Sequence, residues 1–130
     1  FFVATVNSEF GADASHRGGN PGFIHVLDER RIAFPDYAGN NMFQSLGNLQ
    51  TDPRVGLLFL NFETGDTLQL TGKAEVHWDS FRFGVWPGAQ RIVQVAVEHA
   101  VEIAHGFPLR FRLVEASPFN PVESAPRKVN

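Results

Sequence analysis

The sequence predicts a mainly β protein, a small antiparallel β-barrel of six to seven strands with one central helix. The chain is broken at short intervals by 12 glycines and 8 prolines, which favours short strands and tight turns over long helices. Hydrophobic residues make up 43% of the chain and include 13 phenylalanines. Closing the strands into a barrel buries that apolar surface without leaving open sheet edges.

The composition excludes several classes of protein. A chain of 130 residues suits one domain with its own core. The absence of cysteine excludes thiolate zinc sites, iron–sulfur clusters and thiol nucleophiles. The net charge is −3, and the 11 basic residues, of which only Lys73 and Lys128 are lysines, form no basic face for nucleic acid. No apolar run approaches the ~20 residues of a membrane span. We therefore expect a cytoplasmic protein with no nucleic-acid or membrane partner.

The first third of the chain predicts two strands and a hairpin return. Residues 1–6 are β-prone and form the first strand. Residues 10–22 are rich in turn formers and are expected to be a loop. Residues 23–27 alternate as a strand, residues 28–31 form a polar turn, and residues 32–34 return as the second strand of a hairpin.

One segment has convincing helical spacing. Asn40 or Asn41 is suited to cap its start, and Pro53 stops it because proline disfavours helical geometry in the residue before it. The apolar side chains that share one helix face are Met42, Phe43, Leu46 and Leu49.

The second half of the chain predicts further strands. Residues 54–62 are a dense apolar run typical of a buried strand, and residues 67–78 alternate clearly. Residues 91–105 fit either a strand or a helix, and their β-branched side chains favour the strand. Residues 109–115 are expected to be a last short strand. We expect residues 1–121 to be the domain and residues 122–130 a tail or linker, in a chain that begins without Met and is expected to be processed or part of a longer protein.

Two glycine-rich or amide-rich segments are suited to bind a phosphate. Residues 15–22 present backbone N–H groups and Arg17, although a hairpin loop with a solvated arginine is the alternative. Residues 39–41 open the helix, where unsatisfied N–H groups attract anions, although simple capping is the alternative. Thr67 and Gln69 share the polar face of a strand, where hydrogen bonds would recognise a planar polar ligand.

The residues show no sign of a metal site or of the familiar catalytic motifs. Phosphate-loop, dinucleotide-binding and zinc-protease motifs are absent, as is the serine nucleophile elbow. The five histidines have no ligand spacing, so we expect no metal. They are His16, His25, His77, His99 and His105.

The order of several motifs resembles the pyridoxamine 5′-phosphate oxidase-like flavoproteins. The resemblance covers residues 1–78 well and residues 86–121 loosely. The motifs that carry it are HRGGNPGF at 16–23, FPDYAGNN at 34–41, LGNL at 46–49, DPRVGLLF at 52–59 and LQLTGKAEV at 68–76.

The resemblance implies a split β-barrel that forms a homodimer and holds FMN in two clefts between the subunits. The family binds the phosphate with two barrel strands and the helix start, and lays the flavin ring against strand backbone. Asn20 and His25 fall at a basic pair of the oxidases, and Asn40 and Asn41 fall at a Ser-Arg pair. The full set of expected cofactor residues is Ser15, His16, Arg17, Asn20, Phe23, His25, Pro35, Asp36, Tyr37, Asn40, Asn41, Thr67, Gln69 and Arg110.

By this resemblance the chain is an FMN-dependent oxidoreductase of unknown substrate, which takes a small-molecule substrate or electron donor. Arg17 replaces the missing phosphate cations, while Met42 stands where the oxidases have a lysine. The basic residues that hold pyridoxal phosphate have no equivalents, so oxidation of pyridoxamine phosphate is not expected. No catalytic residue is assigned, and His16, Tyr37 and Arg110 are candidate proton donors. The alternatives are a non-catalytic flavin, heme or deazaflavin module, possibly part of a larger reductase, and a structural dimerisation barrel.

Overall fold

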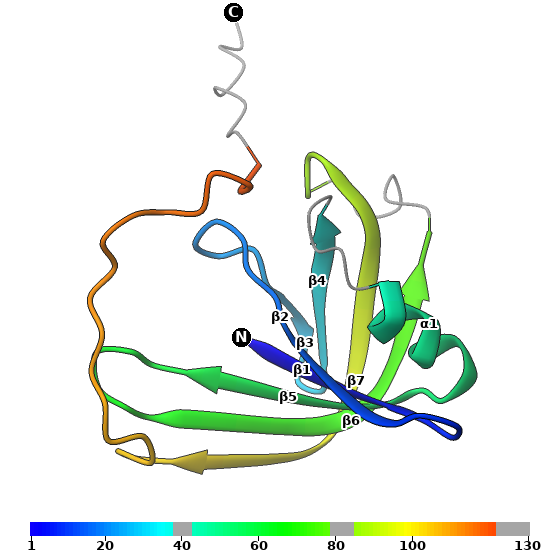
Figure 1. Ribbon diagram of the computed structural model, residues 1–130, viewed down its shortest axis with the longest axis horizontal. Coiled ribbons are helices and arrows are strands. Elements are labelled where there is room, and N and C mark those ends of the chain that lie inside the picture. Colours follow the sequence, from blue (N-terminus) through cyan, green and yellow to red (C-terminus); the bar gives the residue numbers. More distant parts are fainter. Residues whose placement is uncertain (38–42, 79–84, 122–130) are drawn as a thin grey trace, which may run out of the picture.

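In the described part of the chain, seven antiparallel strands form one coiled sheet with a single helix against it (Figure 1). The structure is a computed structural model that describes residues 1–37, 43–78 and 85–121. The sheet order is β2-β1-β5-β6-β7-β4-β3. The elements are β1 Phe2–Asn7, β2 Gly11–His16, β3 His25–Asp28, β4 Arg31–Tyr37, α1 Phe43–Thr51, β5 Arg54–Leu60, β6 Thr67–His77 and β7 Ala89–Ile103. The predicted mainly β class is confirmed, and the sheet is consistent with a split barrel.

The two longest strands, β6 and β7, join the two halves of the sheet. β7 pairs with β6 from Ile92 to Ile103 and with β4 from Ala89 to Ala96. The pairing of β6 with β7 shifts at Thr71 and Gly72. A Cβ on Gly72 would lie 2.0 Å from the carbonyl oxygen of Ala96, so only glycine permits this close approach.

The core lies between the coiled sheet and α1. Of the helix side chains that the structure describes, Leu46 and Leu49 enter it, as the apolar spacing predicts. The amino-terminal Phe1 packs its ring against Phe34 and Phe59, with centroid distances of 4.9 and 5.0 Å. The buried strand residues are Val3, Ile32, Phe34, Val55, Leu57, Leu70, Ala74, Val93 and Val95.

Two expected elements differ from the structure. The expected loop at 10–22 contains the strand β2, which is short, largely exposed and lies at the sheet edge, so it lacks the apolar alternation of a half-buried strand. The expected strand at 109–115 is wrong: this segment is extended but belongs to no sheet. Residues 91–105 are mostly strand, as their β-branched side chains favoured. The expected helix start at Asn40 and Asn41, together with Met42, lies outside the described residues.

Among the described residues, no helix is long and apolar enough to span a bilayer.

Candidate functional site

Four of the predicted cofactor residues line one pocket of about 300 Å³. Asn20 and Phe23 come from the turn between β2 and β3, His25 begins β3, and Tyr37 ends β4. The turn that carries Asn20 is closed by a hydrogen bond of 3.1 Å from the N–H of Phe23 to the Asn20 carbonyl. The other lining residues are Pro21, Gly22, Val85, Trp86, Pro87 and Pro121.

Trp86 forms a fixed aromatic wall of this pocket. Its indole Nε1–H donates a hydrogen bond of 2.7 Å to the carbonyl of Phe23. Its ring lies 4.4 Å from the imidazole of His25, centroid to centroid, and it packs against the buried Ala33 and Ile92. Because the indole is both packed and hydrogen-bonded, it presents a rigid flat surface to the pocket. Sequence analysis did not select Trp86, since the segment before β7 had no regular pattern.

The carboxy-terminal segment, residues 107–121, reaches this pocket at its last residue. The side-chain Nδ2 of Asn20 donates a hydrogen bond of 2.9 Å to the carbonyl of Pro121. This bond joins residues 101 positions apart in sequence, so it fixes the end of the segment over the pocket. The predicted ligand Asn20 thus has a protein partner in the single chain.

A buried group of charges lies at the end of β4. Asp36 faces the core side of the sheet, and its Oδ2 accepts a hydrogen bond of 2.7 Å from Nη1 of Arg91. The other carboxylate oxygen, Oδ1, is buried without a hydrogen-bond partner. Burial raises the pKa of Asp36, while the positive charges of Arg17 and Arg91 oppose that rise.

Arg17 is buried, with only 2% of its surface exposed. Burial lowers the pKa of its guanidinium, and the carboxylates of Asp36 and Asp13 act in the opposite direction. The alternative of a solvated arginine in a hairpin loop is therefore wrong, because Arg17 continues directly from β2 into the interior. The guanidinium of Arg17 already interacts with these two carboxylates. An anionic ligand would therefore have to compete with them for the positive charge.

Ser15 belongs to a polar contact between β2 and the helix. Ser45 of α1 donates its Oγ–H to Oδ2 of Asp13 at 2.6 Å, and its Oγ lies 3.2 Å from that of Ser15. Asn48, one turn later, donates a bond of 3.0 Å to Oγ1 of Thr5. Ser15 therefore helps to fix α1 on the sheet. Sequence analysis missed Ser45 and Asn48 because it searched the helix only for apolar spacing.

The remaining predicted residues lie elsewhere in the single chain. Thr67 lines a separate cavity, and Gln69 lines a third, on the outer face of the sheet. Arg110 is exposed and its Nη1 donates to the carbonyls of Phe107 and Leu109 at 2.7 and 2.9 Å. His16 packs edge to face against the ring of Phe2 and remains exposed. Partial desolvation is the main cause that lowers its pKa, and the positive charges of the amino terminus and Arg17 add to it. These three cavities share no lining residue.

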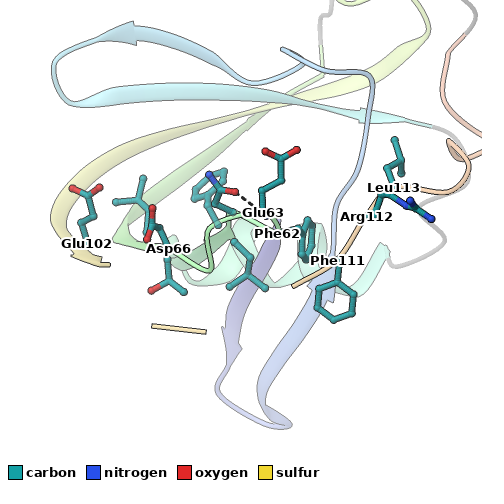
Figure 2. A pocket seen from close by; sticks show the side chains of 12 residues that line it. Phe62, Glu63, Asp66, Glu102, Phe111, Arg112 and Leu113 are labelled. Carbon is teal, nitrogen blue, oxygen red and sulfur yellow. Dashed lines mark hydrogen bonds between the residues drawn. The ribbon is translucent and has the colours of Figure 1, made fainter. Parts of the chain in front are cut away.

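A larger cavity, about 930 Å³, lies where the β5–β6 loop meets the carboxy-terminal segment. Figure 2 shows its acidic side chains, Glu63, Asp66 and Glu102, together with one cation, Arg112. The rings of Phe62 and Phe111 meet edge to face across it, 5.6 Å apart. Three carboxylates against one guanidinium disfavour a phosphate, so size alone does not make this cavity the cofactor site.

Comparison with known proteins identifies the family. A family model described as pyridoxamine 5′-phosphate oxidase matches residues 1–111, and the chain belongs to that family. No curated protein matches it significantly. No group of three or more histidine or acidic side chains suited to a metal occurs in the described parts of the chain.

Solved structures share the fold at low identity. HupZ from Group A Streptococcus is similar with a TM-score of 0.60 and 13% identity, over 82% of this chain and 86% of that one. A candidate pyridoxamine 5′-phosphate oxidase from Lactobacillus delbrueckii gives 0.57 and 17%, over 77% and 81%. A conserved hypothetical protein from Mycobacterium tuberculosis gives 0.56 and 20%, over 89% and 84%. These similarities support the fold and do not indicate a substrate.

Proposed function

We propose that the chain is a flavoprotein that binds FMN as a homodimer and acts as an oxidoreductase. The observation that carries this proposal is the pocket in which Asn20, Phe23, His25 and Tyr37 meet Trp86. Four residues chosen from the sequence for a cofactor converge there from three segments. Family membership over residues 1–111 supports the same assignment.

The residues of this pocket fit a flavin better than those of the larger cavity. The packed indole of Trp86 and the rings of Phe23 and Tyr37 suit a planar aromatic ligand. The turn before β3 adds backbone amides and the Asn20 side chain as hydrogen-bonding groups. The described lining residues include no carboxylate, whereas the larger cavity has three. Of these two cavities, the smaller pocket therefore opposes an anionic phosphate less.

The size of the pocket supports completion of the site by a second copy. A volume of about 300 Å³ lies at the lower limit for cofactor sites. Thr67 and Gln69, which were expected at the same cofactor, line other cavities of the single chain. The outer face of β1, β5 and β6 carries an apolar groove of about 380 Å³ beside Gln69, lined by Phe2, Ala4 and Leu58 among others. A two-fold dimer through this face would offer Gln69 to the partner's site.

FMN, when bound, supplies hydride and one-electron chemistry that amino-acid side chains lack. The chain's own residues hold and orient the cofactor. In the proposed site Trp86 would pack against the cofactor ring, and Asn20, which now donates to the Pro121 carbonyl, would supply a hydrogen-bonding group to it. His25 and Tyr37 are the side chains placed to hold or move a proton there.

The test is the identity and affinity of the ligand. The native protein is purified, its bound ligand is released and identified by mass spectrometry, and the ligand-free protein is titrated with FMN. We expect FMN, and at least tenfold weaker binding in Trp86→Ala than in the matched aromatic surface variant Phe10→Ala, whose side chain is exposed in the β1–β2 turn. Heme or a deazaflavin in place of FMN would establish the binding-module alternative. Failure to bind FMN in the titration would overturn the proposal.

A further inference from the structure

The second half of β7 is an open edge of the sheet. β4 pairs with β7 only from Ala89 to Ala96, and the N–H of Val97 then donates a bond of 2.8 Å to the carbonyl of Arg30. Beyond Val97, β7 pairs with β6 alone in the described part of the chain, and residues 98–103 are all exposed. An exposed edge strand is a template for pairing with another strand.

The carboxy-terminal segment contains a β-prone stretch that belongs to no sheet. Residues 108–116 run without turn or bend, and Leu109, Phe111 and Leu113 alternate with two arginines. These three apolar side chains are 56%, 51% and 82% exposed. The N–H of Phe111 donates a bond of 3.0 Å to the carbonyl of Phe62. N–H groups alternate in direction along an extended chain, so those of the two arginines point away from that contact.

The open edge of β7 and the β-prone stretch of the carboxy-terminal segment are complementary in one antiparallel register. With Arg110 opposite Glu102, opposite charges meet on one face of the pair, and aromatic and β-branched side chains meet on the other. Both kinds of cross-strand pair are favourable. The opposed residues are Leu109–Ile103, Arg110–Glu102, Phe111–Val101, Arg112–Ala100, Leu113–His99 and Val114–Glu98.

We propose that residues 109–114 of one copy add as a strand to residues 98–103 of a second copy. In a two-fold dimer each chain supplies one strand and one edge, so the pairing is made twice. The apolar face of β1 and β5 continues onto β7 through Val101, which pairs with Gln69. The added strand would therefore extend the face already considered for dimerisation. This inference rests on the homodimer of the proposed function.

Within one chain the same register would require a hairpin between β7 and residues 109–114. Hydrogen bonds of the turn after β7 instead hold the segment away from the β7 edge. The N–H of Phe107 donates to the carbonyl of Gly65 at 2.9 Å, and the N–H of His105 donates to Oδ1 of Asp66 at 2.8 Å. Both bonds hold the turn after β7 against the β5–β6 loop. Figure 1 shows the segment in orange passing the ends of β5 and β6 and leaving β7. A second copy is thus the source that reaches the free edge.

Disulfide trapping tests the pairing directly, because these 130 residues include no cysteine. The single variants Ala100→Cys and Arg112→Cys are purified, mixed and oxidised. Opposite residues of an antiparallel pair have Cα atoms about 4.5–5.5 Å apart, which is within disulfide reach. We expect a covalent dimer containing one chain of each kind. Leu113→Cys, whose side chain points to the other face, is the matched partner that should not cross-link to Ala100→Cys.

A charge exchange gives an independent measurement. Glu102→Arg should weaken the dimer about fivefold for each of its two Arg110 contacts, and Glu102→Arg with Arg110→Glu should restore it. Sedimentation equilibrium measures the dimer constant. The absence of the mixed disulfide, a purely intrachain disulfide in the Ala100→Cys/Arg112→Cys double variant, or no restoration would each overturn the strand exchange. Flavin absorbance of the same variants reports separately on the proposed function, since a dimer that binds FMN without this cross-link leaves that proposal intact.

Discussion

At the scale of single residues, the most unusual group is the buried carboxylate of Asp36. One of its oxygens bonds to Arg91 at 2.7 Å, and the other has no hydrogen-bond partner. Arg17 provides a second positive charge, and the indole of Trp78 lies 4.8 Å from the guanidinium carbon of Arg91. A buried charge is tolerated when opposite charges surround it and becomes costly when one of them is removed.

We expect Arg17→Met to lower the free energy of unfolding by about 3 kcal/mol at neutral pH. Methionine keeps an apolar stem in the buried site but removes a charge that opposes the raised pKa of Asp36. The folded pKa of Asp36 then rises further above its ordinary value, so the variant loses stability as pH rises through that range. Urea unfolding at pH 4 and pH 7 measures the effect, which should be smaller at pH 4. Equal losses at both pH values would contradict this account.

The exposed Arg30→Met, in the β3–β4 turn, is the matched control for that measurement. Surface substitutions of this kind change stability by at most about 0.5 kcal/mol. If Arg17 acts only through phosphate binding, Arg17→Met will instead resemble the control in the absence of ligand.

The sequence predicted four residues of the candidate pocket because local pattern determines where turns and strand ends lie. Asn20, Phe23, His25 and Tyr37 lie close to turns and strand ends, where local pattern determines position, and the structure gathers them in one pocket. The sequence did not predict Trp86, because the contact between the segment before β7 and the β2–β3 turn spans 63 residues. The roles of the predicted residues in binding a cofactor stay predictions.

At the scale of elements, the irregularity in β6 depends on one glycine. The carbonyl oxygen of Ala96 lies where a Cβ on Gly72 would stand, and the neighbouring backbone atoms of β7 are 3.0 and 3.1 Å from that position. Backbone on a central strand has little freedom to retreat, because β7 is held by β6 and β4 together. The strand that joins both halves of the sheet therefore depends on the missing side chain.

Gly72→Ala should destabilise the fold by about 3 kcal/mol, since overpacking against fixed backbone has few ways to relax. Gly47→Ala is the matched change in α1, where a Cβ meets nothing within 4 Å. It should stabilise the protein by up to about 1 kcal/mol, because alanine is the better helix former. Thermal unfolding of the two variants measures both effects. A neutral Gly72→Ala would show that the two strands separate without cost.

Strands with a clear pattern of apolar residues were predicted more accurately than strands without one. β5 and β6 carry clear apolar runs or alternation and were predicted closely. β2 is exposed at the sheet edge, and its sequence pattern predicts a loop instead of a strand. Residues 109–115 have a strand pattern but find no sheet in the single chain. Local pattern reports a preference for extended structure, whereas the presence of a partner strand is decided by the whole assembly.

At the scale of the whole molecule, the proposed cofactor and the proposed dimer are not independent. The pocket around Asn20 holds about 300 Å³, and Gln69 faces away from it on the outer sheet. A ligand that touches both copies binds the dimer more tightly than the monomer. By thermodynamic linkage, the bound ligand must then strengthen the association of the two copies by the same factor.

We therefore expect FMN to strengthen the dimer and dilution of the protein to weaken FMN binding. Sedimentation equilibrium with and without FMN gives one coupling factor, and FMN titrations above and below the dimer constant give the other. The two factors should agree and should reach about 5- to 150-fold, the usual range for coupled sites. Gln69→Ala should reduce both factors together without unfolding the monomer, because Gln69 is an exposed side chain on β6. FMN affinity that is independent of protein concentration would instead place the whole cofactor within a single chain.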